Sequence, residues 1–151
     1  MRIYISLLLF FVTGLTAGAI ASRPDLNKPL IVLGGHEHWR AVGDWTKGDM
    51  VVVLRGHPKE SGEYIIREKL PPHTASAVMY HPMGENNTVL SGTWYIGFGD
   101  KVDPANATEL PAGSYVYIPP GVHHYSITKS QGVELEESAD GPYGRTVVPA
   151  P

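Results

Sequence analysis

The chain has 151 residues, of which 42% are hydrophobic and 18% charged, and this length fits one globular domain but not two. Its formal net charge of −3 argues against the strongly basic surface of a nucleic-acid-binding protein. Because the chain has no cysteine, disulfide bonds, thiolate metal sites and cysteine nucleophiles are excluded.

The N-terminus has the pattern of a secretory signal peptide. Arg2 gives a positive start, residues 7–12 form the densest part of an apolar run, and Ala19-Ile20-Ala21 fits the small-x-small cleavage pattern. We therefore expect residues 1–21 to be removed and the mature chain to be secreted or periplasmic, without stable membrane insertion. The alternative is an uncleaved membrane anchor, for which the apolar run has about the minimum length.

The mature chain is predicted to be all-β. Residues 22–44 are expected to form a polar linker with a short apolar edge strand at Leu30–Leu33, residues 45–148 the domain, and residues 149–151 a tail. Nearly every segment of the domain is short, β-rich and bounded by Gly or Pro, and no ten-residue window has a helical stripe. The expected strands are residues 50–54, 64–70, 75–81, 88–98, 114–118, 124–129, 133–137 and 145–148, with a polar loop at 101–110. This pattern predicts a β-sandwich or β-barrel.

Three residues have the types and spacing of a metal site. His81 precedes Glu85 by four positions, and His124 follows a distant turn that is rich in Pro and Gly. In a rolled-up sheet these side chains can converge inside the barrel. Two imidazoles and one carboxylate suit a borderline divalent metal and leave positions open for substrate or oxygen. The alternative is a barrel mouth that keeps these polar side chains without a metal.

At these residues the sequence resembles the cupin superfamily. The second half of the first cupin motif, G-x5-H-x-H-x3-4-E-x6-G, is matched by His81, Glu85 and Gly92. The second motif, G-x5-P-x-G-x2-H-x3-N, is matched by Gly113, Pro119, Gly121 and His124, with Thr128 at the position of Asn. The wider match covers roughly residues 45–148 and is similar to single-domain cupins related to the sensor half of zinc-dependent anti-sigma factors.

The resemblance implies a fold, a site and an assembly. The fold would be a cupin-type jelly-roll β-barrel, also called a double-stranded β-helix. The metal ligands would be His81, Glu85 and His124, and the divalent metal would be Fe, Mn, Zn or Cu, or the site would hold none. Cupins of this type often pair through N-terminal strands, so Leu30–Leu33 could provide the edge of a homodimer.

Met79 stands where the family has its first metal-binding histidine. A thioether suits soft, copper-like metals, and residue parity places Met79 on the same face as His81, so Met79 either belongs to the metal shell or packs in the core. His73 is expected at a turn and does not obviously replace the missing ligand. His123 should point to the face opposite His124.

The positions of Tyr64, Arg67 and Trp94 in a cupin barrel make them candidate pocket-lining residues. Arg67 would hold an anionic group of a substrate, or would extend along the sheet edge instead. The segment His36-Glu37-His38 lies outside both motifs and is either a second metal pair or simply solvated.

Three functions remain open for a small-molecule-binding barrel of this kind. The first is a metal-dependent enzyme that activates dioxygen or polarises a carbonyl group. The second is a non-catalytic exported sensor or binding protein for a metal or small ligand. The third is a metal-free, degenerate cupin. No nucleophile-elbow or phosphate-binding glycine motif occurs, which argues against nucleophilic hydrolysis and nucleotide chemistry.

Overall fold

The computed structural model describes residues 27–42 and 46–150, so the predicted signal peptide lies outside the described residues. The strands in this range are β1 (Arg40–Ala41), β2 (Met50–Arg55), β3 (Gly62–Leu70), β4 (Met79–Tyr80), β5 (Glu85–Phe98), β6 (Thr108–Pro111), β7 (Tyr115–Ile118), β8 (His124–Ile127), β9 (Val133–Gly141) and β10 (Thr146–Val147). Among the described residues there is no helix with the length and apolarity of a membrane span.

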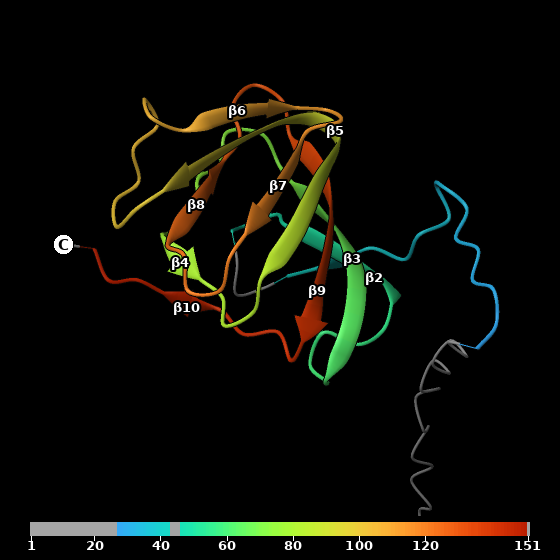
Figure 1. Cartoon of the computed structure of the whole chain (residues 1–151). Coiled ribbons are helices and arrows are strands. Elements are labelled where there is room, and N and C mark those ends of the chain that lie inside the picture. The colour runs from blue at the N-terminus through green and yellow to red at the C-terminus, as the bar shows by residue number, and fades with distance from the viewer. Residues whose placement is uncertain (1–26, 43–45, 151) are drawn as a thin grey trace, which may run out of the picture.

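The strands pair antiparallel in a sheet that curls into two layers (Figure 1). The hydrogen-bonded order is β1-β2-β3-β9-β5-β8-β4-β10, and β6 and β7 both pair with β5. The first half of β5 pairs with β9 and β7, whereas its second half pairs with β8 and β6, so β5 belongs to both layers. This arrangement is the all-β jelly-roll barrel that the sequence predicted.

β5 changes layers at a glycine. The register between β5 and β9 shifts between Val89 and Ser91, and Gly92 follows with a φ of 76°. A Cβ atom on Gly92 would lie 2.0 Å from the carbonyl oxygen of Gly132, a distance that no side chain can occupy. A bulge followed by a glycine with positive φ lets the long strand bend from one layer into the other.

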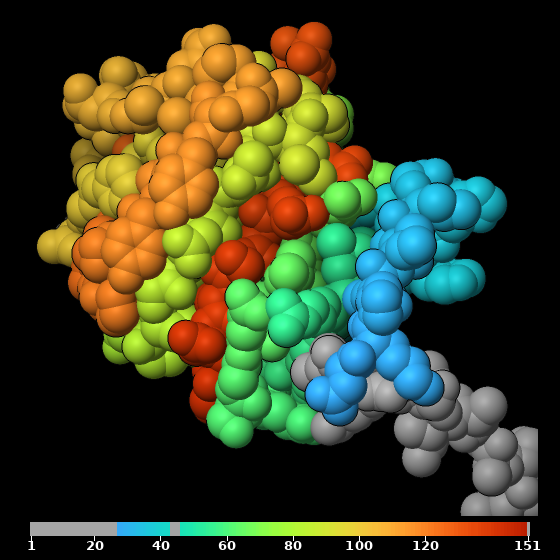
Figure 2. Space-filling model, turned by 45° about the vertical axis from the view of Figure 1, so that its right-hand side comes forward, coloured from blue at the N-terminus to red at the C-terminus, as the bar shows by residue number. Residues whose placement is uncertain are grey.

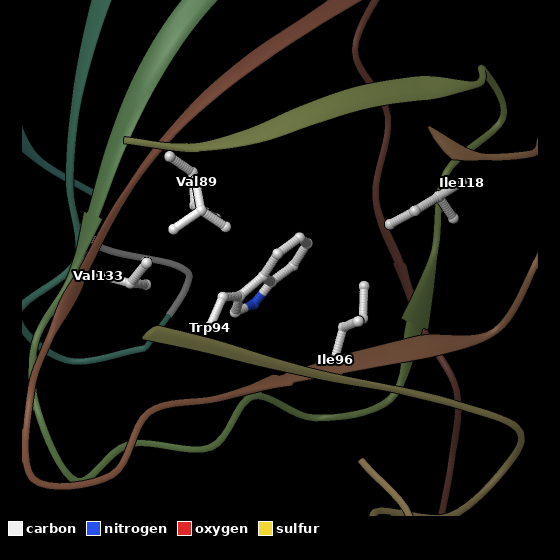
Figure 3. Packing of buried hydrophobic residues seen from close by; sticks show 6 residues of the cluster. Val89, Trp94, Ile96, Ile118 and Val133 are labelled. Atoms are coloured by element: carbon white, nitrogen blue, oxygen red, sulfur yellow. The ribbon is translucent and has the colours of Figure 1, made fainter. Parts of the chain in front are cut away.

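The main apolar core lies between the layers. Side chains from β5, β7 and β9 point toward one another, and the Trp94 indole packs among Val89, Ile96 and Ile118 (Figure 3). These residues are at most 3% exposed, and Val133 and Leu135 complete the cluster. Trp94 and Ile96 share a face of β5 because side chains alternate along a strand. This packing holds β5 in place and therefore also positions Glu85 at its start.

Most of the predicted strands are confirmed, although β5 begins at Glu85 rather than at residue 88 and β9 continues to Gly141 rather than ending at residue 137. Within residues 75–81 only Met79–Tyr80 form a strand, and Ala75 makes an isolated bridge to Ile127. The end of the predicted loop forms β6. Leu30–Leu33 is not a strand in the structure, and Ile31 is 80% exposed; the edge strand of the N-terminal segment is β1 instead.

The segment before β1 lies beside β2 and β3 (Figure 2). Glu37 Oε1 accepts a hydrogen bond from Arg67 Nη1 at 3.1 Å, and the Lys69 ammonium lies 3.8 Å from the centre of the Trp39 ring. Both cations are on β3, so ionic and cation–π contacts attach this segment to the outer face of the barrel.

Candidate metal centre

The three predicted ligands converge in the interior. His81 directly follows β4, Glu85 begins β5 and His124 begins β8. One potential ligand atom from each residue lies within 4.8 Å of the others, and all three residues are buried. The two imidazole rings are 5.2 Å apart between their centroids.

Backbone hydrogen bonds bring the two histidines together. In the register of β4 and β8, Met79 lies directly opposite His124, so the residue two positions before His81 is the neighbour of His124. The turn before β8 is tied to the same place, because the amide of Gly121 donates to the carbonyl of His81 at 2.8 Å. Gly121 has a φ of 74°, a conformation that glycine adopts without strain.

Both imidazoles are prepared for metal binding. Nδ1 of His81 lies 2.8 Å from the carbonyl oxygen of Gly144, and Nδ1 of His124 lies 2.9 Å from that of Val122. A carbonyl oxygen only accepts, so each Nδ1 carries the hydrogen and each Nε2 keeps its lone pair. Burial lowers the pKa of His81 to about 4 and also lowers the pKa of His124. Both rings are therefore neutral at pH 7, which is the form that binds metals.

Glu85 contributes the acidic group of the site. Its side chain is 5% exposed, and its Oε1 atom lies 3.3 Å from Nδ1 of His81 but has no hydrogen-bond partner among the described residues. Burial and, second, repulsion by Glu137 raise the pKa of Glu85 to about 9. A divalent cation bound by the two imidazoles and this carboxylate would satisfy the unpaired oxygen and favour the ionised form of Glu85. The residues therefore fit a metal ion of the kind that imidazole and carboxylate ligands share.

Two further buried carboxyl groups were not predicted from the sequence. Glu68 on β3 and Glu137 on β9 both point inward, and the Tyr64 hydroxyl donates to Glu137 Oε1 at 2.7 Å. Burial, partly offset by this hydrogen bond, raises the pKa of Glu137 to about 7. Burial and the neighbouring acids, chiefly Glu137, raise the pKa of Glu68 well above its ordinary value. The period-two pattern signalled both residues. Glu68 shares a face of β3 with Tyr64 and Ile66. Glu137 shares a face of β9 with Val133 and Leu135.

A cavity of about 70 Å³ lies next to these groups. Its walls include the three candidate ligands, Glu68 and Glu137, together with Asp49, Asn87 and Arg145, which were also not predicted. Of the other predicted residues, Met79 and Trp94 line it. The cavity therefore combines a candidate metal centre with acidic, amide and aromatic groups in one space.

The predictions for Tyr64 and Arg67 need correction. Tyr64 is fully buried and reaches the cavity only through Glu137, to which its hydroxyl donates. Arg67 lies on the outer face, where Nε contacts Glu136 at 3.0 Å and Nη1 contacts Glu37. Residues 64 and 67 are an odd number of positions apart on one strand, so alternation places their side chains on opposite faces. Arg67 therefore does not hold a substrate inside the barrel.

The remaining histidines lie elsewhere. His123 stacks on Tyr80 and its Nδ1 lies 2.5 Å from Asp100 Oδ1, on the opposite side of β8 from the site, as predicted. His73 is at a turn with a φ of 59°, also as predicted. Within residues 27–42 and 46–150, the segment around Glu37 forms no second cluster of metal-binding residues.

Comparisons with known proteins agree with this fold. A family model described as "Cupin domain" matches residues 66–136. No curated protein sequence is similar enough to this chain to count as a relative. The narrower likeness to sensor-type cupins stays a prediction.

Solved structures share the architecture at low sequence identity. The polyketide cyclase RemF from Streptomyces resistomycificus aligns with a TM-score of 0.70 and 16% identity over 82% of this chain and 88% of that chain. An RmlC-like cupin from Shewanella frigidimarina aligns with a TM-score of 0.58 and 15% identity over 75% of this chain and 91% of that chain. A third structure is a salicylate 1,2-dioxygenase mutant from Pseudoaminobacter salicylatoxidans in complex with gentisate. It aligns with a TM-score of 0.55 and 14% identity over 68% of this chain and 30% of that chain. The matched family model and the shared fold together show that this chain belongs to the cupin superfamily.

Proposed function

We propose that this protein binds a divalent metal ion through His81, Glu85 and His124 and takes up a small molecule in the adjoining cavity. The observation that carries the proposal is the state of the ligand atoms. Both Nδ1 atoms lie at hydrogen-bond distance from backbone carbonyls, and Oε1 of Glu85, 3.3 Å from Nδ1 of His81, has no hydrogen-bond partner within the described part of the chain. Such outer hydrogen bonds fix the orientation of metal-binding imidazoles. A bound metal would supply Lewis acidity, and for iron or copper also redox chemistry.

One observation favours an enzyme over a passive binding protein or sensor. Glu137 faces the cavity, accepts a hydrogen bond from Tyr64, and has a pKa raised close to neutrality. A carboxyl group in this state can both donate and accept a proton at physiological pH, which is the property of a general acid–base residue. Perturbed carboxyl groups in a cavity next to a candidate metal centre are typical of active sites.

The sequence supports a proposal for the localisation of the protein. The N-terminal pattern supports export, followed by cleavage after Ala21, to the periplasm or the outside of the cell. The exposed apolar side chains of Leu30–Leu33 support a homodimer that covers them, since apolar patches on the surface often mark contacts between proteins.

The decisive experiment measures metal content and affinity. The mature chain is purified without a histidine tag, its metal content is determined by mass spectrometry, and the metal-free protein is titrated with Zn²⁺, Mn²⁺, Fe²⁺ and Cu²⁺ by calorimetry. We expect one metal ion per chain. His124→Ala should lower the affinity at least a hundredfold, because it removes one of three protein ligands.

His123→Ala is the matched control. It removes the neighbouring imidazole on the other face of β8, where His123 contacts Asp100, and should leave the affinity unchanged. Equal effects of the two substitutions, or no stoichiometric binding of any of these metals, would leave only the metal-free cupin.

A further inference from the structure

We propose that Asn87 and Trp94 are specificity-determining residues that donate hydrogen bonds to the oxygen atoms of a small, neutral hydroxycarbonyl ligand in the cavity. The inference rests on the proposed function, because it names the class of molecule that would bind beside the metal centre. It is carried by three buried polar atoms, two of them donors and one an acceptor.

The two donors are buried and face the cavity. Asn87 is 4% exposed and Trp94 is 3% exposed, and both line the cavity. Asn87 Nδ2 and Trp94 Nε1 have no hydrogen-bond partner among residues 27–42 and 46–150. Because nearly all buried donors in folded proteins are paired, two unpaired donors in one cavity call for a partner that enters from outside.

The geometry of β5 aims both residues at the same space as the metal centre. Glu85 and Asn87 are two positions apart and lie on one face of the strand. Beyond the bulge and Gly92, Trp94 is again on the buried face, where its ring packs in the core (Figure 3), and the residue also lines the cavity. One strand thus presents a candidate metal ligand and two hydrogen-bond donors to a single bound molecule.

The third atom is an acceptor. Asp49 is 3% exposed and lines the cavity; its Oδ2 accepts from the backbone of Thr46, whereas Oδ1 has no hydrogen-bond partner in the described part of the chain. Two donors and one acceptor are complementary to a molecule that carries a carbonyl group and a hydroxyl group.

Size and charge narrow the ligand further. A cavity of about 70 Å³ holds a few water-sized groups, which corresponds to a compact molecule of few heavy atoms. Its wall already contains the carboxyl groups of Glu68, Glu85 and Glu137, whose raised pKa values show that this interior disfavours further negative charge, and among the described residues the one cationic side chain in the wall is Arg145. Leu70 and Leu135 also line the cavity, so its wall offers apolar side chains to the carbon atoms of a ligand. A neutral hydroxyketone meets all three conditions.

The probe is hydroxyacetone, which carries both groups on three carbon atoms, and butan-2-one is the matched probe without the hydroxyl. Each is titrated into the Zn²⁺-loaded and the metal-free protein while the indole N–H signals of ¹⁵N-labelled protein are recorded. The signal that disappears in Trp94→Phe identifies Trp94. We expect this signal to move downfield and saturate with hydroxyacetone, and butan-2-one to bind roughly tenfold more weakly because it lacks one hydrogen bond.

Substitution variants then distinguish an effect on probe binding from an effect on the stability of the fold. Trp94→Phe keeps the apolar ring and Asn87→Leu keeps the volume, and each should weaken hydroxyacetone binding roughly tenfold. Asn87→Leu should also raise the melting temperature of the ligand-free protein, because it removes an unsatisfied buried amide. The control is Asn86→Leu, on the other face of β5, whose amide donates to Ser138 and accepts from Tyr115. It should lower the melting temperature and leave probe binding unchanged.

The outcomes are distinct. If hydroxyacetone fails to bind the Zn²⁺-loaded protein, or binds without moving the Trp94 signal, the inference is wrong although the metal site stands. If Asn87→Leu and Trp94→Phe bind the probe as the parent does, the unpaired atoms hold ordered water only, and the inference is again wrong. If Zn²⁺ does not bind but hydroxyacetone still shifts the Trp94 signal, the metal proposal fails and the recognition by these residues stands.

Discussion

The buried acids make the stability of the metal-free protein depend on pH in a direction opposite to that of most carboxyl groups. Burial and the charge of Glu137 raise the pKa of Glu85 to about 9, far above its value of 4.5 in an unfolded chain. Between these two pKa values the folded protein binds one more proton than the unfolded chain, so stability falls as pH rises. The buried histidines have lowered pKa values, so their effect has the opposite sign and fades about one pH unit above their unfolded-state pKa of 6.5; it is present in every Glu85 variant and cancels when a variant is compared with the parent.

The difference between a Glu85 variant and the parent from pH 6.5 to 8.5 therefore isolates this carboxyl group. Each group that stays protonated only in the folded state contributes a slope of about −1.4 kcal/mol per pH unit. Glu85→Gln replaces the acid with a neutral side chain of the same shape. From pH 6.5 to 8.5 the free energy of unfolding of the parent should therefore fall by roughly 3 kcal/mol more than that of Glu85→Gln.

The assay is urea unfolding followed by tryptophan fluorescence at pH 6.5, 7.5 and 8.5, with EDTA present to exclude metals. Glu63→Gln is the matched control on the surface, where that carboxylate pairs with Arg55 and its side chain is 53% exposed. It should keep the pH slope of the parent. A parent protein whose stability in EDTA is constant or rises from pH 6.5 to 8.5 would refute the reasoning, and so would a Glu85→Gln variant with an unchanged slope.

Other substitutions test the bend, the metal shell and the acid–base pair. Gly92→Ala should destabilise the fold by about 2 kcal/mol or more, measured by urea unfolding, because the residue has positive φ and a Cβ would meet a backbone oxygen. Met79→His should tighten Zn²⁺ binding roughly tenfold in calorimetry, since Met79 lies opposite His124; unchanged affinity would place Met79 outside the metal shell. Tyr64→Phe removes the hydrogen bond that lowers the pKa of Glu137, so this carboxyl should titrate at higher pH by NMR, and an unchanged titration would contradict the pairing.

Local patterns in the sequence were sufficient to predict the fold and the convergence of His81, Glu85 and His124. Strands such as β2 and β3 alternate buried and exposed residues or contain β-branched runs, and Gly and Pro mark their ends. The pairing of His81 and Glu85 with the distant His124 was predictable because the spacing of glycine and proline around each follows the cupin motifs. Hydrophobic periodicity alone would not have indicated that these segments are neighbours.

The errors came from contacts that a linear sequence does not specify. The apolar run Leu30–Leu33 has strand composition, but in the structure the edge of β2 is paired with β1 instead. Arg67 was expected in the pocket although alternation along β3 places Tyr64 and Glu68 on the inner face and Arg67 on the outer one. Glu68 was missed because charged residues are usually exposed, and an acid at an inward position contradicts this rule. Such exceptions are most common at functional sites.

The apolar core and the cavity should respond to substitution in opposite directions, and this difference tests whether the polar interior is functional. In the core, Ile96 is 1% exposed, so Ile96→Val should destabilise the metal-free protein by about 0.5–1.5 kcal/mol through lost packing. At the cavity, Glu85→Gln at pH 8.5 should stabilise the metal-free protein, because it removes a buried acid that must either ionise or hold its proton at alkaline pH. Added Zn²⁺ should reverse this order, since only the parent carboxylate gains a bond to the metal. If Glu85 had a purely structural role, both substitutions would destabilise the metal-free protein and Zn²⁺ would change neither difference. Urea unfolding of the two variants with EDTA and with Zn²⁺ distinguishes these cases, because only a binding site makes the sign of the stability change depend on its ligand.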